Sequence, residues 1–89
     1  MRILLVEDDD MIGESVMAGL ETEGHAIDWV RDGNSALLAL NTTPYSLVIL
    51  DLGLPGKDGL QVLKEMRGRR DPTPVLVTTA RDTVDDRIK

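Results

Sequence analysis

The feature that most constrains this fold is a run of four apolar residues that stops at a carboxylate. Leu47–Leu50 contains no polar residue, Asp51 follows it directly, and a turn-forming segment, Pro55–Gly59, comes shortly after. A continuous apolar run of this length between turn signals is typical of a strand buried on both faces of a parallel sheet. Because an unpaired buried carboxylate is costly, Asp51 either caps a nearby turn or lies at the strand end to do chemistry.

Three more segments read as strands. Ile3–Val6 is a second continuous apolar run and leads into the acidic run Glu7–Asp10, whereas Val75–Val77 leads into Thr78, Thr79 and Ala80. Ala26–Val30 alternates apolar and polar residues, which indicates a half-exposed edge strand. Helical spacing of apolar residues predicts helices between these strands, around residues 12–20, 36–40 and 60–66, and a fourth helix is predicted from Asp82 onward.

This alternation of strands and helices predicts an α/β fold. The expected sheet is parallel, with right-handed crossovers and helices on both faces. Because the second strand reads as an edge, the first and third strands lie side by side, which gives the flavodoxin-like, doubly wound order 2-1-3-4. Their carboxyl ends meet where this architecture binds ligands, so Glu7 and Asp8 are expected beside Asp51.

Three converging carboxylates predict a metal site. They repel one another and raise the pKa of at least one of them unless a cation lies between. Oxygen ligands without His or Cys favour Mg²⁺, a phosphate commonly completes such a site, and a carboxylate there can attack phosphorus. Thr79 is placed to offer its hydroxyl to the phosphoryl group.

Each feature also has a simpler interpretation. An acidic run is expected in a solvated turn before a helix, Asp51 would serve as a structural cap, and Thr79 would be an ordinary strand end. The conjunction of acids after two neighbouring strands with a threonine after the next one favours a functional site.

Composition narrows the class of protein. The chain has 89 residues, enough for one small domain, and a formal net charge of −6, which disfavours direct binding of nucleic acid. It contains no cysteine, which suits a reducing cytoplasm. No apolar run approaches the ~20 residues of a membrane span, so no membrane contact is expected. These features predict a soluble cytoplasmic domain.

Three motifs give the sequence a family resemblance. They are ILLVEDD at Ile3–Asp9, VILDLGLPGKDG at Val48–Gly59 and PVLVTTARD at Pro74–Asp82. In their order and spacing the chain resembles the CheY-like receiver domains of response regulators in bacterial two-component systems. Within these it is similar to the OmpR/PhoB class, with QseB/PmrA-like features, and the resemblance covers essentially the whole chain.

The resemblance implies a role for each candidate residue. Asp51 would accept a phosphoryl group from a sensor histidine kinase or a small phosphodonor, which makes the domain a signalling switch rather than an enzyme. Asp8 would ligate Mg²⁺ directly, Glu7 largely through water, and the backbone carbonyl of Gly53 would be the third protein ligand. Thr79 would be the switch hydroxyl that moves toward the phosphoryl group.

The chain also departs from the family pattern. Residues 1–89 do not include the family's fifth strand and helix, so we expect a C-terminally truncated receiver. Its phosphorylation is expected to be slow or undetectable, because the fifth-strand lysine is absent, and to recover when that segment is restored. The resemblance also implies a DNA-binding output domain that acts in transcription regulation, which we expect to lie outside residues 1–89. Without a fifth strand, Val75–Thr78 is expected to be an exposed edge. We expect a homodimer or higher oligomer through this strand or through the C-terminal helix, or else a partly molten monomer.

Two other functions compete with the phospho-accepting switch. A phosphohydrolase of the haloacid dehalogenase kind also uses a strand-end aspartate, but it needs a second aspartate two residues later, where this chain has Gly53. The other alternative is a module for protein interaction or dimerisation whose phosphotransfer is impaired.

Overall fold

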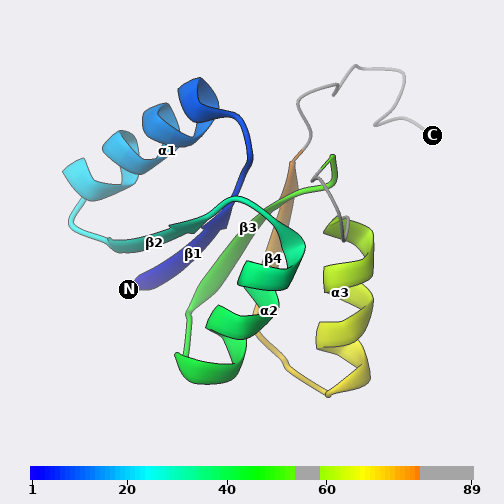
Figure 1. Ribbon diagram of the computed structural model, residues 1–89. Helices are drawn as coiled ribbons and strands as arrows, with labels where there is room; N and C mark the ends of the chain where they lie inside the picture. The colour runs from blue at the N-terminus through cyan, green and yellow to red at the C-terminus, as the bar shows by residue number, and fades with distance from the viewer. Residues whose placement is uncertain (54–58, 79–89) are drawn as a thin grey trace, which may run out of the picture.

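The computed structural model describes residues 1–53 and 59–78, and it shows a parallel sheet flanked by helices (Figure 1). The elements in chain order are β1 (Arg2–Val6), α1 (Asp10–Thr22), β2 (Ala26–Val30), α2 (Gly33–Thr42), β3 (Leu47–Asp51), α3 (Gly59–Gly68) and β4 (Val75–Thr78). The strand order is β2-β1-β3-β4, which confirms the predicted doubly wound topology. The helix predicted from Asp82 lies outside the described residues.

The two apolar runs form the centre of the sheet. β1 pairs with β2 on one side and with β3 on the other, so that Ile3 lies opposite both Ile27 and Leu47. β3 pairs in turn with β4, where Asp51 lies opposite Thr78. β1 and β3 therefore end at the same edge of the sheet, side by side.

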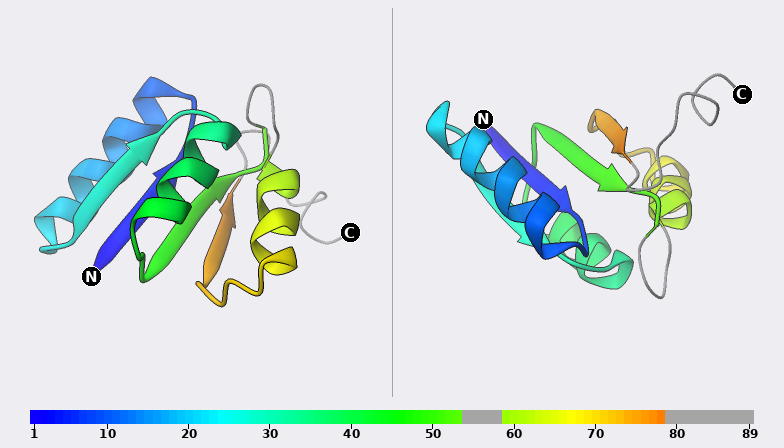
Figure 2. Two further views of the ribbon diagram at one scale, coloured as in Figure 1. Left: turned by 60° about the horizontal axis from the view of Figure 1, so that its bottom comes forward. Right: turned by 90° about the horizontal axis from the view of Figure 1, so that it is seen from above.

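Successive residues of these central strands enter two separate cores, because side chains alternate between the faces of a sheet. The larger core contains Leu4, Val6, Val48 and Leu50 and is covered by α2 and α3 through residues such as Ala36, Val62 and Met66. The smaller one contains Ile3, Leu5 and Ile49 and is covered by α1 through Val16 and Leu20. Figure 2 shows the resulting layers, with α1 on one face and α2 and α3 together on the other.

Short polar residues begin two of the helices. The Asp9 carboxylate accepts from the Ile12 N–H at 2.9 Å, and the Asp32 carboxylate accepts from the Ser35 N–H at 2.7 Å, so each satisfies a backbone donor that has no partner within its helix. Gly24 follows α1 with φ +91°, the left-handed conformation that glycine adopts without penalty.

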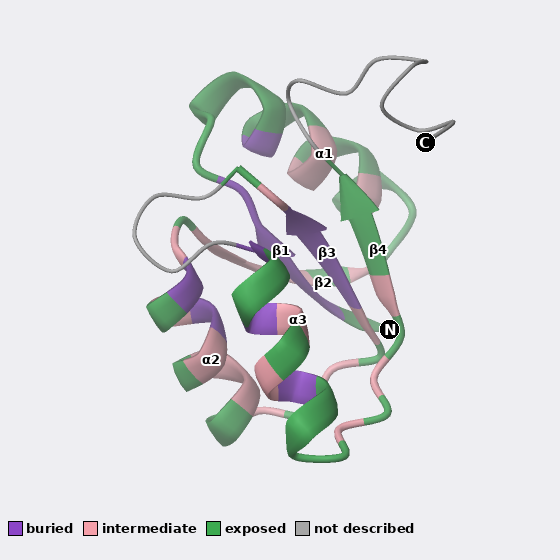
Figure 3. Ribbon diagram, turned by 90° about the vertical axis from the view of Figure 1, so that its right-hand side faces the viewer, coloured by how far each residue is buried: buried purple, intermediate pink, exposed green. Residues whose placement is uncertain are grey.

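β4 is an edge strand of the described sheet and is the most exposed of its apolar segments. Leu76 is 55% exposed and Val77 is 43% exposed, in contrast to the buried β1 and β3 (Figure 3). The prediction of an exposed apolar β4 is confirmed for these residues. None of the helices in the described ranges is long and apolar enough to cross a bilayer.

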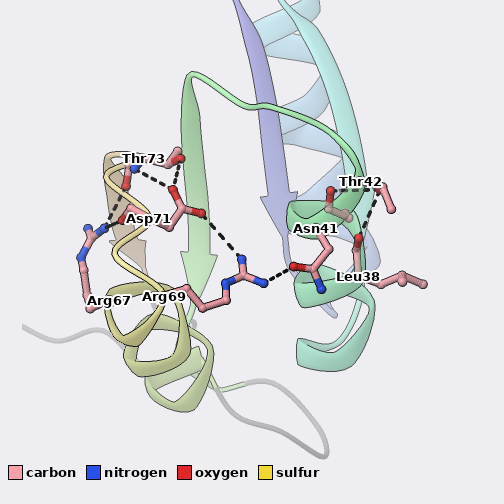
Figure 4. A network of polar contacts seen from close by, with 8 residues as sticks. Leu38, Asn41, Thr42, Arg67, Arg69, Asp71 and Thr73 are labelled. Carbon is pink, nitrogen blue, oxygen red and sulfur yellow. Dashed lines mark hydrogen bonds and ion pairs between the residues drawn. The ribbon is translucent and has the colours of Figure 1, made fainter.

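A polar network ties the connection between α3 and β4 to the rest of the domain (Figure 4). The Asp71 carboxylate accepts from the N–H of Thr73 at 3.0 Å and from its hydroxyl at 2.6 Å. Arg67 donates to the backbone carbonyls of Asp71 and Thr73 at 2.7 and 3.2 Å. Arg69 lies 3.8 Å from the Asp71 carboxylate and also donates to Asn41 of α2. The loop that delivers the chain into β4 is thereby fixed.

Asp71→Asn is expected to lower the free energy of unfolding by about 1 kcal/mol at neutral pH. The hydrogen bonds from Thr73, aided by nearby arginines, hold the pKa of Asp71 below its ordinary value. This stabilisation is complete above the unfolded-state pKa and disappears as pH falls through the lower folded-state pKa. Urea unfolding at neutral pH and at about pH 3 checks this.

The matched control for this prediction is Asp10→Asn. Asp10 pairs with Arg31, but its side chain is 69% exposed, so its loss should change stability much less. An equal effect of the two substitutions at neutral pH would contradict the role given to the Asp71 network.

Candidate metal and phosphoryl site

The predicted carboxylates meet at the carboxyl edge of the sheet. Glu7 and Asp8 follow β1, Asp51 ends β3, and each contributes a carboxylate oxygen to a group whose atoms all lie within 4.8 Å of one another. The parallel pairing of β1 with β3 produces this arrangement, because it aligns Val6 with Leu50 and so brings the next residues together. The sequence prediction that residues more than forty positions apart converge here is confirmed.

Two of the three carboxylates are buried and fixed by backbone donors. Asp51 is 1% exposed and Glu7 is 3% exposed, whereas Asp8 is exposed to solvent. The Gly53 N–H donates to Asp51 at 3.1 Å, and the Asp9 N–H donates to Glu7 at 3.1 Å. Asp51 therefore combines both sequence interpretations, since it orders the turn after β3 and also lies at the sheet edge.

Burial and neighbouring charges shift the pKa of Glu7. Burial raises the pKa of its carboxyl group, and the charges of Asp51 and Asp8, together with a side-chain hydrogen bond to Asp51, act in the same direction. The hydrogen bond from Asp9 opposes these effects without cancelling them. The sequence predicted a raised pKa in this cluster from repulsion among the carboxylates, and the structure shows that burial is the largest cause, with repulsion adding to it.

The donor set suits a hard divalent cation. The cluster offers only carboxylate oxygens, with buried and solvent-exposed members side by side, and includes no His or Cys. Such ligands match Mg²⁺, which is bound by one or two carboxylates and retains several waters. The backbone carbonyl of Gly53 stays a predicted ligand, and Thr79, Ala80 and the turn residues 55–58 lie outside the described residues.

Gly59, the first residue of α3, lies against the backbone of Asp51. A Cβ atom built at Gly59 would lie 2.4 Å from the carbonyl oxygen of Asp51 and 2.8 Å from the Cα of Leu52. Only glycine permits this close approach, because both contacts are with backbone that has little freedom to move. The contact fixes α3 against the strand end that carries Asp51.

One aromatic and one basic residue near the acidic run Glu7–Asp10 were not predicted to take part in the site. The indole N–H of Trp29, in β2, donates to the backbone carbonyl of Glu7 at 2.8 Å. The guanidinium of Arg31 lies 4.2 Å from the centre of the Trp29 ring and pairs with Asp10. No sequence motif includes either residue. The sequence prediction considered only the ends of β1 and β3, and β2 is separated from β3 by β1.

Comparison with known proteins decides the family. The model of the response regulator receiver domain matches residues 3–89. The chain belongs to this family. The receiver domain is 51% identical over 89 residues to the transcriptional regulatory protein QseB of Haemophilus influenzae, in an alignment that covers all of this chain and 40% of that protein.

Solved structures agree with this assignment. The receiver domain resembles the response regulator TrrA of Thermotoga maritima in complex with Mg²⁺–BeF, with a TM-score of 0.86, 35% identity, and coverage of 99% of this chain and 75% of that one. It also resembles a chain of the complex between the histidine kinase ThkA and TrrA, with a TM-score of 0.84, 36% identity, and coverage of 93% and 72%. The receiver domain spans about two fifths of the length of the curated relatives it matches.

Asp8→Ala is expected to abolish measurable Mg²⁺ binding while leaving the fold intact. The affinity of an all-oxygen site depends on its clustered charge, and Asp8 is the exposed member that leaves no buried gap when it is removed. Loss of one repelling charge should raise the stability of the metal-free domain slightly. Calorimetric Mg²⁺ titration and urea unfolding check both results.

The control is Glu14→Ala, an exposed acidic residue of α1 that removes the same charge away from the cluster. Equal Mg²⁺ affinities in the Asp8 variant and the wild type would refute the site as assigned.

Proposed function

We propose that this receiver domain is a phospho-accepting switch in which Asp51 takes a phosphoryl group from a sensor histidine kinase or a small phosphodonor. The observation that supports this most strongly is the position of Asp51. It is a buried carboxylate at the end of β3, within 4.8 Å of Glu7 and Asp8, in a chain that belongs to the receiver family.

The proposed reaction is a transfer between two nucleophiles. An Asp51 carboxylate oxygen attacks the phosphorus of the donor, and the bond from phosphorus to the donor's nitrogen or oxygen breaks, with its electron pair remaining on the donor atom. The Gly53 N–H holds one Asp51 oxygen, which orients the carboxylate. Mg²⁺ bound by Glu7, Asp8 and Asp51, with the Gly53 carbonyl as a further ligand, would neutralise charge that develops on the phosphoryl oxygens.

The wider setting of the proposal comes from relatives. TrrA has been solved with Mg²⁺–BeF and together with the histidine kinase ThkA, which supports Mg²⁺ and a kinase as partners of this chain. The QseB relative is a transcriptional regulatory protein, so we propose that the complete protein controls transcription from the cytoplasm. DNA contact would belong to sequence beyond this acidic domain. Thr79 keeps its proposed role as the switch hydroxyl.

The proposal is tested by intact mass measurement after treatment with acetyl phosphate and Mg²⁺. We expect the wild type to gain one phosphoryl group, which a metal chelator prevents, and Asp51→Asn to gain none. Glu14→Gln, which changes the net charge by the same amount, should behave as the wild type. Incorporation by Asp51→Asn, or none either by residues 1–89 or by a longer chain that includes the family's fifth strand and helix, would overturn the proposal.

A second candidate function is association through β4, favoured by the exposure of Leu76 and Val77 at the edge of the described sheet. Edge strands with apolar side chains pair readily with strands of other chains. We therefore predict homodimerisation through β4. Sedimentation of the purified chain should show a concentration-dependent dimer. Leu76→Lys should shift it toward monomer, whereas Leu38→Lys on the exposed side of α2 should not. A wild type that sediments as a monomer at all concentrations would contradict it.

A further inference from the structure

The backbone of Glu7 is held from both sides by the end of β2. Its N–H donates to the carbonyl of Val30 at 3.0 Å, and its carbonyl accepts from the indole N–H of Trp29 at 2.8 Å. The first bond extends the pairing between β1 and β2 by one residue. The second bond comes from a side chain, so the hydrogen bond that holds the Glu7 carbonyl depends on the identity of residue 29.

Trp29 is itself wedged against α1. A Cβ atom at Gly13 would lie 2.0 Å from Cζ2 of the indole ring and 2.5 Å from its Cε2, so the ring occupies space that any other residue at this position would need. Gly13 is also the one buried residue of α1, one turn after the Asp9 cap, and its N–H donates to the Asp9 carbonyl at 2.9 Å. The indole therefore contacts Glu7 at the start of the loop that joins β1 to α1 and Gly13 in the first turns of α1.

Arg31 completes this arrangement. Its guanidinium lies 4.2 Å from the centre of the Trp29 ring and pairs with Asp10, the first residue of α1. Stacking of a guanidinium on an indole is favourable, and the ion pair connects the same side chain to the helix start. Trp29 in β2 and Arg31 directly after it thus contact the two ends of the segment Glu7–Asp10, although β1 separates β2 from β3.

We propose that Trp29 is a positioning residue for the metal site, which holds the loop Glu7–Asp9 so that the carboxylates of Glu7 and Asp8 face Asp51. The consequence for Mg²⁺ rests on the proposed function, whereas the consequence for the loop does not. Loss of the indole N–H removes a donor from the partly buried carbonyl of Glu7, which lies between β1 and Asp8. The loop backbone is then less restrained, which weakens the hydrogen bond from the Asp9 N–H to the Glu7 carboxylate.

A purely structural role for Trp29 makes a different prediction. The ring also packs against the small core of Ile3, Leu5 and Ile49, and a packing residue acts on stability alone. Trp29→Phe keeps an aromatic ring but removes the N–H donor and the atoms closest to Gly13. A positioning role therefore appears as an effect on the loop and on metal affinity that exceeds the effect on other parts of the fold.

The metal-free protein provides the first test. Hydrogen exchange followed by NMR should show faster exchange of the Glu7 and Asp9 amides in Trp29→Phe by about three- to tenfold, the range expected for loss of one hydrogen bond. The Ala36 amide, which donates to Asp32 at the start of α2, should exchange as in the wild type. Uniform acceleration of all three amides would show a packing role and overturn the proposal.

Metal affinity provides the second test. Calorimetric titration should give an Mg²⁺ Kd about three- to tenfold weaker for Trp29→Phe. If the wild type binds Mg²⁺ and the variant binds it equally well, the positioning role is wrong. If the wild type binds none, the proposed function fails, and the exchange experiment still decides whether Trp29 holds the loop.

Gly13 allows the same bond to be broken without a change to Trp29. Gly13→Ala must displace the indole and should weaken Mg²⁺ binding as Trp29→Phe does, while Gly19→Ala, at an open position of the same helix, should leave binding unchanged. In the Trp29→Phe background, Gly13→Ala should have little further effect, because the two substitutions act through one contact. Additive effects on the Mg²⁺ Kd would refute a shared contact.

Discussion

Gly59→Ala is expected to lower the free energy of unfolding by about 2–4 kcal/mol. The added Cβ would overlap the carbonyl oxygen of Asp51 at 2.4 Å and approach its carbonyl carbon at 3.0 Å. Neither atom belongs to a flexible side chain, so α3 must move away from the end of β3. Because α3 supplies Val62 and Met66 to the larger core, this movement would also loosen the packing. Urea unfolding measures the loss directly.

Gly68→Ala at the other end of α3 is the matched control. A Cβ there meets no atom within 4 Å, and alanine favours a helix more than glycine does, so this variant should be neutral or slightly more stable. Gly59→Ala should in addition weaken Mg²⁺ binding, since the displaced backbone carries Asp51. A Gly59 variant as stable as the Gly68 variant would mean that the close contact between α3 and β3 is not maintained in solution.

The architecture was predictable because its central strands follow a simple rule. Ile3–Val6 and Leu47–Leu50 are apolar at every position, and only a strand covered on both faces gives each of these side chains an apolar environment. Once these two strands are adjacent, the positions of Glu7, Asp8 and Asp51 follow from the strand ends alone. The cluster was accessible from the sequence because it depends on topology and not on side-chain packing.

The supporting contacts were not predictable, since they depend on how particular side chains pack. Trp29 lies in a strand whose alternation indicates only an edge, and nothing in the sequence connects it to Gly13 or Glu7. Helical spacing also placed Ile12 and Gly19 with the apolar residues of α1, yet both are exposed. α1 covers one small core through Val16 and Leu20, so its buried face is narrower than the spacing suggested.

Glu7→Gln is expected to be more stable than the wild type without metal and less stable than the wild type with Mg²⁺ bound. Without metal the variant should be more stable than the wild type by about 1–2 kcal/mol, because a neutral amide removes a buried charge beside Asp51 and Asp8. With Mg²⁺ the wild type should gain about 2.7 kcal/mol at a hundredfold excess over its Kd, whereas the variant, which has lost a ligand charge, should gain much less.

The pH dependence of the metal-free comparison gives this prediction a second, independent check. The folded-state pKa of Glu7 is raised, so the folded protein holds the proton more tightly than the unfolded chain. The cost of the Glu7 charge is complete above the folded-state pKa, decreases as pH falls below it, and is gone below the unfolded-state pKa. As pH falls from about 8 toward the unfolded-state pKa of about 4.3, the wild type should regain stability and the advantage of Glu7→Gln should disappear.

Urea unfolding in a metal chelator across this range measures the effect, with Glu14→Gln as the control of equal charge on the exposed face of α1. The control should lack this advantage, because Glu14 is exposed and is not part of the cluster. A constant difference between Glu7→Gln and the wild type at all pH values would mean that Glu7 does not carry a costly charge in the folded state. The repulsion assigned to the three carboxylates would then be wrong.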